Sequence, residues 1–148
     1  MSSLEQGRPV EILLVEDNPG DVRLTQEAFK EGKVSNNLNV VGDGVEALKF
    51  LRREDGYGTA PRPDIVLLDL NLPKMGGREV LEKVKADPEL KRIPVVILTT
   101  SKAEEDVFKT YSSHANCYIT KPVDFERFIE VVKMIEGFWL TVVRLPAN

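Results

Sequence analysis

The sequence predicts a doubly wound α/β fold, in which helices cover both faces of one five-stranded parallel sheet. Three observations support this prediction. Short apolar runs alternate with helix-like segments from one end of the chain to the other. The apolar runs lack polar alternation, which is typical of strands that are covered on both faces. The chain has 148 residues, of which 42% are hydrophobic, and this suffices for one such domain.

Each element follows in order from the apolar pattern and from the residues that interrupt it. A strand over Val10–Val15 precedes a helix over Gly20–Glu31, which Asp17 or Asn18 would cap with Pro19 in its first turn. The remaining strands and helices alternate over Leu38–Val41, Gly44–Arg53, Ile65–Leu68, Gly77–Ala86, Val95–Leu98, Ala103–Ser112, Cys117–Ile119 and from Phe125 onward. Because crossover connections between parallel strands are right-handed, this order predicts helices on both faces of the sheet.

Polar side chains follow the apolar runs at the points where the predicted strands end. Sheets of this kind carry their sites beyond the carboxyl ends of the strands. The runs end in Glu16 and Asp17, in Asp69, in Thr99 and, for the last strand, in Lys121. Carboxylates placed this close repel one another unless a cation binds. Oxygen ligands favour Mg²⁺, with Mn²⁺ as the alternative. We therefore expect Asp69 to accept a phosphoryl group, with the metal and Lys121 neutralising its charge and Thr99 donating a hydrogen bond.

The segments LLVEDNPGD, DIVLLDLNLPKMGG, PVVILTTS and YITKP resemble the motifs of receiver domains of two-component response regulators. The resemblance covers roughly residues 11–138 and implies the flavodoxin-like (βα)5 fold with strand order 2-1-3-4-5. It implies that Asp69 is the phosphoacceptor and that Asp17 ligates the metal directly. It further implies that Glu16, where many receivers carry Asp, reaches the metal through water, and that Asn71 contributes its backbone carbonyl.

The same resemblance implies a conformational switch. Thr99 would be the switch hydroxyl, and Tyr118 would be an aromatic ring that turns from exposed to buried when Asp69 is phosphorylated. Lys121 would be the invariant lysine of the family, and its bond to Pro122 would be cis. The phosphoryl group would come from a phosphohistidine of a sensor histidine kinase. The chain would catalyse its own phosphorylation and slow dephosphorylation, and would not be an independent metabolic enzyme.

The C-terminal segment predicts self-association. Beside the core-facing side of the last helix lies a second apolar stripe, made of Val131, Met134, Phe138 and Val142. Either a second copy of the chain covers this stripe, or the tail 141–148 folds back over it. A further resemblance is to single-domain response regulators that pair with phytochrome-type histidine kinases. It rests on the FWL and LP segments of the tail, the NLP after Asp69 and the GYGTAPRP loop. Those proteins dimerise through the last helices and the tail.

These patterns predict three regions. Residues 1–9 would be a flexible N-terminus, residues 10–138 the receiver domain, and residues 139–148 an extension that could serve dimerisation. The net charge of −4 argues against a nucleic-acid-binding protein. The sequence also lacks an apolar stretch long enough to span a bilayer, so we expect a cytoplasmic protein.

Three other functions fit the sequence less well. A phosphatase of the haloacid-dehalogenase type needs an acid two residues after its nucleophile, where Asn71 stands. A nucleotide-binding flavodoxin-like protein needs a glycine-rich loop where the acidic segment 16–19 stands. A pseudo-receiver keeps the fold without the chemistry, whereas the set of reactive side chains is complete here.

Other polar residues are interpreted without a role in the site. The carboxylates Asp21, Asp43 and Asp64 are interpreted as helix caps or loop residues. Thr100 is interpreted as a neighbour of the site without a function. We expect His114 on the surface and Cys117 to serve packing.

Overall fold

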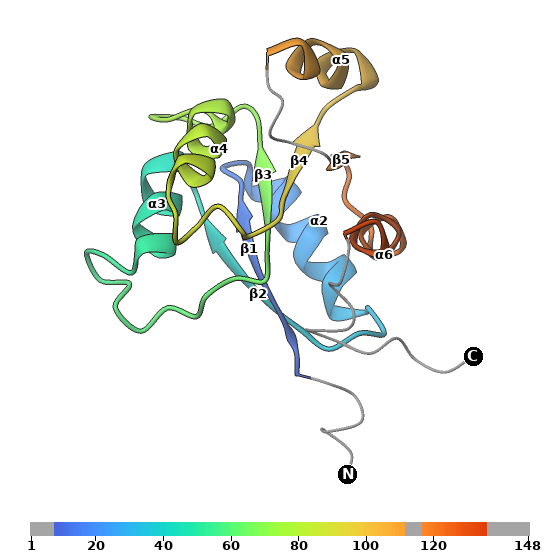
Figure 1. The fold of residues 1–148 in the computed structure, drawn as a ribbon. Helices are drawn as coiled ribbons and strands as arrows, with labels where there is room; N and C mark the ends of the chain where they lie inside the picture. The colour runs from blue at the N-terminus through green and yellow to red at the C-terminus, as the bar shows by residue number, and fades with distance from the viewer. Residues whose placement is uncertain (1–7, 112–116, 136–148) are drawn as a thin grey trace.

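The computed structural model describes residues 8–111 and 117–135, which alternate between strands and helices (Figure 1). The elements are β1 (Val10–Val15), α2 (Pro19–Lys30), β2 (Asn36–Val41), α3 (Gly44–Arg52), β3 (Ile65–Asp69), α4 (Gly77–Ala86), β4 (Val95–Thr99), α5 (Lys102–Tyr111), β5 (Cys117–Thr120) and α6 (Phe125–Lys133). Every predicted element is present. Apart from the end of the last helix, the predicted bounds differ from the observed ones by at most two residues.

The five strands form one parallel sheet in the order β2-β1-β3-β4-β5, as the resemblance to receiver domains implies. The chain therefore leaves β1 toward one edge of the sheet and returns past it to build the other half. In the register of the sheet, Val15 lies beside Leu68, and Asp69 lies beside Leu98. Thr99 lies beside Thr120. The carboxyl ends of the strands thus meet along one edge, where the predicted site residues follow them.

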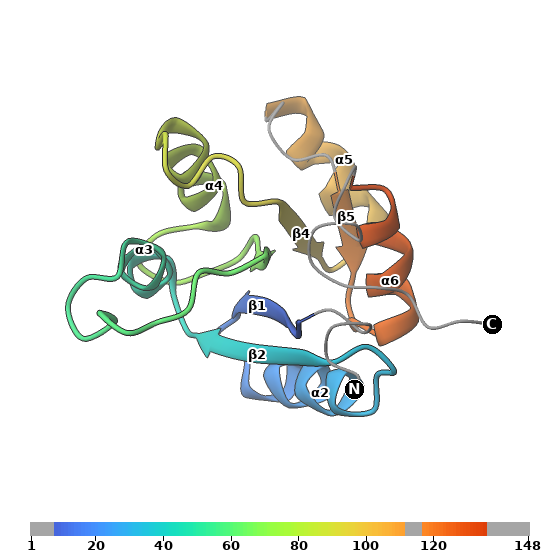
Figure 2. The ribbon, with the colours of Figure 1, turned by 60° about the horizontal axis from the view of Figure 1, so that its bottom comes forward.

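Alternate residues of each buried strand point to opposite faces of the sheet, and each face has its own core. Figure 2 shows the helices distributed around the sheet. One core joins the sheet to α3, α4 and α5 through buried residues that include Leu48, Leu81 and Phe108. The other core joins the sheet to α2 and α6 through Phe29 and Phe128, whose ring centroids are 4.8 Å apart. Both faces are therefore covered, which explains the apolar runs without alternation.

Side-chain caps fix where the helices begin. Asn18 accepts a hydrogen bond from the Asp21 backbone N–H at 2.9 Å, so Asn18 caps α2 and Asp17 remains available to the site. Asp43 caps α3 by accepting from the Glu46 N–H at 2.8 Å, which confirms its interpretation as a cap.

Two glycines let backbone segments approach each other closely at the site edge. A Cβ atom on Gly77, in the first turn of α4, would overlap the carbonyl oxygen of Asp69 and lie 2.9 Å from the Leu70 Cα. A Cβ atom on Gly44, at the start of α3, would overlap the carbonyl oxygen of Met75. The loop after Asp69 therefore packs directly against the first turns of both helices.

Helix α6 ends at Lys133, earlier than the long helix predicted from the sequence. At its end the N–H groups of Met134 and Ile135 donate to carbonyl groups three residues earlier, which tightens the last turn. Val131 is fully buried in the core with α2, so its assignment to an exposed interface stripe was wrong. Met134 is 64% exposed, as that assignment requires. Phe138, Val142 and the tail lie outside the described residues.

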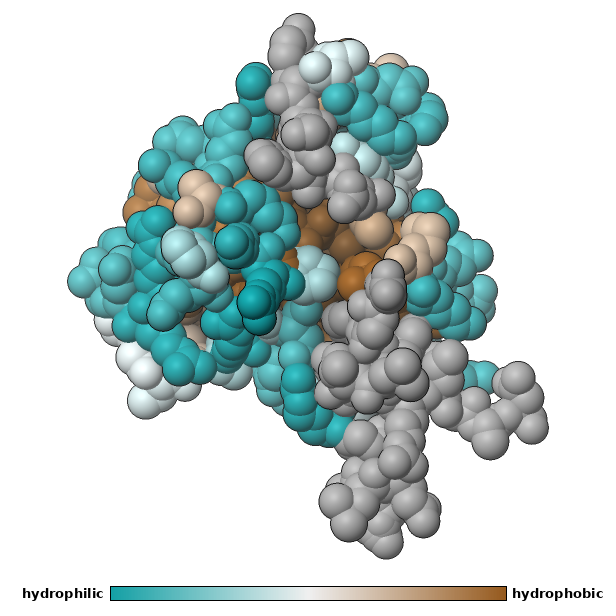
Figure 3. Space-filling model, in the orientation of Figure 1, coloured by the Kyte–Doolittle hydropathy of each residue, from teal (hydrophilic) through white to brown (hydrophobic). Residues whose placement is uncertain are grey.

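Among the described residues, no helix combines the length and the apolar character that crossing a membrane would require. Figure 3 shows that much of the visible face is hydrophilic, with hydrophobic residues showing between the helices.

Candidate functional site

Three carboxylates gather at the carboxyl edge of the sheet. Glu16, Asp17 and Asp69 each place an oxygen within 4.8 Å of the other two. Glu16 and Asp69 are each only 2% exposed, whereas Asp17 faces solvent. Because β1 and β3 are parallel neighbours, the end of one strand delivers Glu16 and Asp17 beside the end of the other, which carries Asp69. The predicted acidic cluster is therefore formed.

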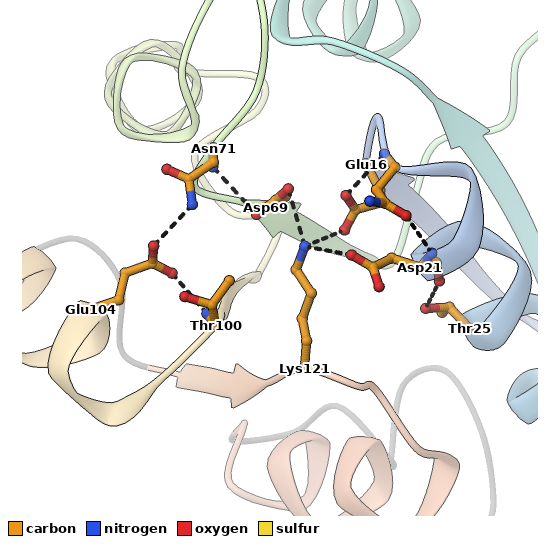
Figure 4. A network of polar contacts seen from close by, with 9 residues as sticks. Glu16, Asp21, Thr25, Asp69, Asn71, Thr100, Glu104 and Lys121 are labelled. Carbon is orange, nitrogen blue, oxygen red and sulfur yellow. Dashed lines mark hydrogen bonds and ion pairs between the residues drawn. The ribbon is translucent and has the colours of Figure 1, made fainter.

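Lys121 reaches this cluster from the end of β5 (Figure 4). Its Nζ lies 2.9 Å from a Glu16 oxygen and 3.3 Å from an Asp69 oxygen. Its backbone N–H donates to the Thr99 carbonyl at 2.8 Å, which ties the loop to β4. The peptide bond between Lys121 and Pro122 is cis, as predicted.

Asp21 is a member of the site that the sequence interpretation missed. Its carboxylate lies 3.1 Å from the Lys121 Nζ (Figure 4). Asp21 stands in the first turn of α2, which Pro19 opens. The proline was a usable signal, because it starts the helix immediately after the acidic pair and so places Asp21 in the first turn beside that pair.

The charges in the cluster shift the pKa values of its members. Burial raises the pKa of Glu16 to about 7, the hydrogen bond from Lys121 opposes this rise, and the negative charge of Asp69 adds to it. Burial alone would lower the pKa of Lys121, but its bonds to Glu16 and Asp21 and the charge of Asp69 outweigh burial and raise it. Lys121 is therefore a fixed positive charge, while the carboxylates around it outnumber it.

Thr99 has a buried hydroxyl group that is not satisfied by its surroundings. The residue is 0% exposed, and its Oγ1 finds no hydrogen-bond partner among the described residues. A buried polar atom without a partner costs free energy, on the order of 1–3 kcal/mol. Its place at the end of β4, beside the strand that carries Asp69, suits a phosphoryl oxygen as the missing partner.

Asn71 contacts Asp69 through its backbone and turns its side chain elsewhere. Its N–H approaches an Asp69 oxygen at 3.3 Å, while its Nδ2 donates to Glu104 at 2.9 Å. Glu104 also accepts from the Thr100 N–H at 2.8 Å, so Thr100 has a contact that its sequence interpretation did not foresee. The spacing of Ser101 and Glu104 is that of a capping box, a signal that could have drawn attention to Glu104.

Tyr118 is already buried, at 8% exposure, where the switch model expects an exposed ring before phosphorylation. Its ring meets that of Phe108 edge-on, with centroids 6.1 Å apart, and Lys109 Nζ lies 5.0 Å from its centroid. These contacts hold the ring against α5. Burial, the largest influence, raises the pKa of its hydroxyl.

The donors of the site fit a hard divalent cation and a phosphoryl group. The cluster offers carboxylate oxygens only, the ligand type of Mg²⁺ and Mn²⁺. The Lys121 ammonium group and the Thr99 hydroxyl, which has no partner among the described residues, are groups of the kind that bind phosphoryl oxygens. Glu16, Asp17 and Lys121 thus gather around Asp69, and Thr99 ends the neighbouring strand β4.

A family model for the response regulator receiver domain matches residues 12–133. The chain belongs to the response regulator receiver family. Response regulator Rcp1 of Synechocystis sp. is a relative that is 49% identical over 143 residues, and the match covers 97% of each of the two chains. The receiver fold predicted from the motifs is therefore confirmed.

Solved structures of similar receivers extend this comparison. The phosphorylated cyanobacterial phytochrome response regulator RcpA is 51% identical with a TM-score of 0.72, and the match covers 95% of this chain and 100% of that one. The Mn²⁺-bound form of response regulator Rcp1 is 50% identical with a TM-score of 0.70, covering 94% and 100%. The predicted resemblance to response regulators of phytochromes is thus confirmed.

Proposed function

We propose that this receiver is a single-domain response regulator that takes a phosphoryl group from a sensor histidine kinase onto Asp69. The observation that carries the proposal is the buried Asp69 carboxylate, which lies 3.3 Å from Lys121 and on the strand next to the one that ends in Thr99. An Asp69 oxygen attacks the phosphorus of a phosphohistidine, so that an O–P bond forms while the N–P bond breaks and the histidine leaves as an imidazole. Lys121 balances the charge on the phosphoryl oxygens.

The proposal includes Mg²⁺, with Mn²⁺ as an alternative. Asp17, Asp69 and the backbone carbonyl of Asn71 would hold the ion, and Glu16 would reach it through water. When bound, the ion supplies positive charge that stabilises the transferring phosphoryl group. The oxygen-only cluster supports this assignment, as does the Mn²⁺-bound form of the similar Rcp1.

We also propose how the phosphoryl group acts as a switch. A hydrogen bond from the Thr99 hydroxyl to the phosphoryl group would satisfy an atom that otherwise has no partner among the described residues. This draws Thr99 toward Asp69 and favours the arrangement in which Tyr118 is buried against Phe108. Phosphorylation would therefore shift the population toward one arrangement of α5, β5 and α6. The protein acts as a switch and not as an independent metabolic enzyme.

The partners follow from the similar proteins. A phytochrome-type histidine kinase is the proposed phosphoryl donor, because similar proteins are named as response regulators of phytochromes. Homodimerisation through the last helix and the tail, a cytoplasmic location and the lack of nucleic-acid and membrane partners remain predictions from the sequence. Exposed Met134 is the described residue that supports the dimer.

The first test is phosphorylation by a small donor. Incubation of the protein with acetyl phosphate and Mg²⁺ should add one phosphoryl group, detected by intact mass. Asp69→Asn should gain none, since an amide oxygen is a poor nucleophile. Phosphorylation of the variant at the level of the wild type would place the phosphoacceptor elsewhere. An unmodified wild type, folded and bound to Mg²⁺, would reject the proposal for this donor and leave transfer from a kinase as the deciding measurement.

A further inference from the structure

One carboxylate joins the two loops that flank the phosphoacceptor. One oxygen of Glu104 accepts a hydrogen bond from the Asn71 side chain at 2.9 Å, and the other accepts from the Thr100 N–H at 2.8 Å. Figure 4 shows Glu104 lying between the two donors. Asn71 belongs to the loop after β3, and Thr100 belongs to the loop after β4. We refer to Glu104, Asn71 and Thr100 as the Glu104 bridge.

The Glu104 bridge depends on a carboxylate of fixed position. An ionised carboxylate offers two acceptor oxygens, whereas the amide of glutamine offers one acceptor and one donor group. Because each donor meets a different oxygen of Glu104, glutamine in the same position would turn its NH₂ group toward one of the two donors and lose that bond. The Glu104 backbone N–H donates to the Ser101 hydroxyl at 3.1 Å, which fixes the residue in the first turn of α5.

Both donors of the bridge stand next to residues of the reactive set. Asn71 also holds an Asp69 oxygen through its backbone N–H at 3.3 Å. Thr100 directly follows Thr99, the residue with the unpaired hydroxyl. The bridge therefore connects the two sides of the site at its solvent edge, where Asn71 and Thr100 are exposed.

We propose that Glu104 is a positioning residue that holds these two loops together over phosphorylated Asp69 and slows the entry of water. The proposal rests on the proposed function of Asp69. In hydrolysis a water oxygen bonds to phosphorus, the bond from phosphorus to the Asp69 oxygen breaks, and phosphate leaves with the protons of the water. Because the Asn71 side chain is tied to Glu104, loss of the bridge lets the loop after β3 move away and opens the path of the water.

The test compares the lifetimes of the phosphorylated forms. Protein labelled with acetyl phosphate and Mg²⁺ is separated from the donor by rapid gel filtration, and the phosphoryl group remaining is followed by intact mass. Glu104→Gln should lose it roughly threefold to tenfold faster than the wild type, the factor that one hydrogen bond represents. Glu105→Gln is the matched control. It makes the same charge change one residue away, and Glu105 pairs with Lys102 and Lys109 outside the bridge.

A double-mutant cycle separates the bridge from a weakened helix end. If Glu104 acts through Asn71, Glu104→Gln will have no further effect on the lifetime when Asn71→Ala is already present. A mere loss of the α5 cap would lower the melting temperature in both backgrounds and would shorten the lifetime in both. Persistence of the lifetime effect in the Asn71→Ala background would therefore overturn the bridge.

The remaining outcomes distinguish this inference from the function on which it rests. A wild type that accepts a phosphoryl group, with an unchanged lifetime in Glu104→Gln, would overturn the bridge and leave the proposed function intact. A wild type that accepts none from either acetyl phosphate or a histidine kinase would overturn both. A shortened lifetime that appears equally in Glu105→Gln would reduce the effect to general charge and would also overturn the bridge.

Discussion

At the scale of single residues, the site is governed by an excess of negative charge around one ammonium group. Lys121 lies within ion-pair distance of Glu16, Asp21 and Asp69, and Asp17 adds a further carboxylate. One lysine cannot balance them all. The pKa of Glu16 rises to about 7 mainly because the residue is buried. Near neutral pH, Glu16 is therefore protonated in a fraction of the molecules, which reduces the excess of negative charge.

This proton predicts a pH dependence of metal binding. Mg²⁺ and the Glu16 proton compete, because a charged Glu16 attracts the ion and the water that would join them, whereas a protonated Glu16 does not. Below pH 7 the proton prevails, and above it the carboxylate is free. Mg²⁺ should therefore bind about tenfold more weakly at pH 6 than at pH 8, as expected for one titrating group. Isothermal titration calorimetry at both pH values measures the ratio.

Glu16→Gln is the matched variant for this experiment, since glutamine has nearly the same shape and does not titrate in this range. Its Mg²⁺ affinity should change much less between pH 6 and pH 8. An equal pH dependence in the variant would assign the titration to another group of the cluster.

The stability of the metal-free protein should depend on the same Glu16 proton, but it should fall as the pH rises, whereas the affinity for Mg²⁺ should increase. The pKa of Glu16 is higher in the folded protein than its ordinary value of 4.5, so the folded state binds this proton more tightly than the unfolded state. The contribution is fully present below pH 4.5 and is lost as the pH rises through about 7. Urea unfolding in chelator should therefore show a contribution of Glu16 that falls across this interval and is missing from Glu16→Gln.

The residues of the site differ in how well the sequence alone could predict them. Asp69, Thr99 and the acidic pair after β1 each end an apolar run or directly follow one, so strand order suffices to bring them together. Asp21 and Glu104 stand on helices. Whether they reach the site depends on the direction of each side chain, which the spacing of apolar residues does not determine. Strand ends were thus predictable, whereas the residues at helix starts could be noticed from Pro19 and from the Ser101–Glu104 spacing but their contacts could not be assigned.

At the scale of secondary-structure elements, α6 shows why an apolar stripe need not be a free surface. The helix packs against both the sheet and α2, so its buried arc is wider than a single contact would make it. Phe128, Val131 and Val132 are all buried. The sequence divides these positions into two stripes because a helical projection does not contain the neighbouring helix. The remaining exposed apolar position of the described helix end is Met134.

Substitutions on α6 test this division. Val131→Ala should lower the free energy of unfolding by about 2 kcal/mol, because it removes two buried methyl groups and leaves a cavity. Met134→Ala should change it by less than about 0.5 kcal/mol, as expected at an exposed position. Urea unfolding at a low protein concentration, where the monomer prevails, gives both values. Equal losses in the two variants would contradict the assignment of Val131 to the core.

At the scale of the whole molecule, the order of apolar runs was enough to predict the sheet and both covered faces. The strand order came from the family resemblance. With that order, the site residues that follow the strands are expected at the same edge of the sheet. Assembly with a second copy is a different matter. The predicted interface lies largely beyond residue 135, outside the described residues, and its one described exposed member is Met134.

Sedimentation velocity tests the predicted dimer. The wild type should sediment as a dimer at high concentration, and Met134→Glu should shift the population toward monomer because it places a charge in an apolar contact. Leu24→Glu is the matched control, since Leu24 is 52% exposed on α2 and is not one of the predicted interface residues. A wild type that remains monomeric at high concentration, with and without acetyl phosphate, would refute the dimer.

The close approach of Gly77 to Asp69 ties the loop after β3 to α4, while hydrogen bonds of Glu104 tie the same loop to α5. No side chain separates the first turn of α4 from the Asp69 carbonyl, so the backbone there is closely packed and has little room to move. The contact of this loop with α5 is made by hydrogen bonds that can exchange, those of Glu104 with Asn71 and Thr100. The direction in which the signal leaves the site is therefore set by where the backbone cannot move. If Asp69 is phosphorylated as proposed, we expect a displacement to pass toward α5, which carries Glu104, more readily than toward α4.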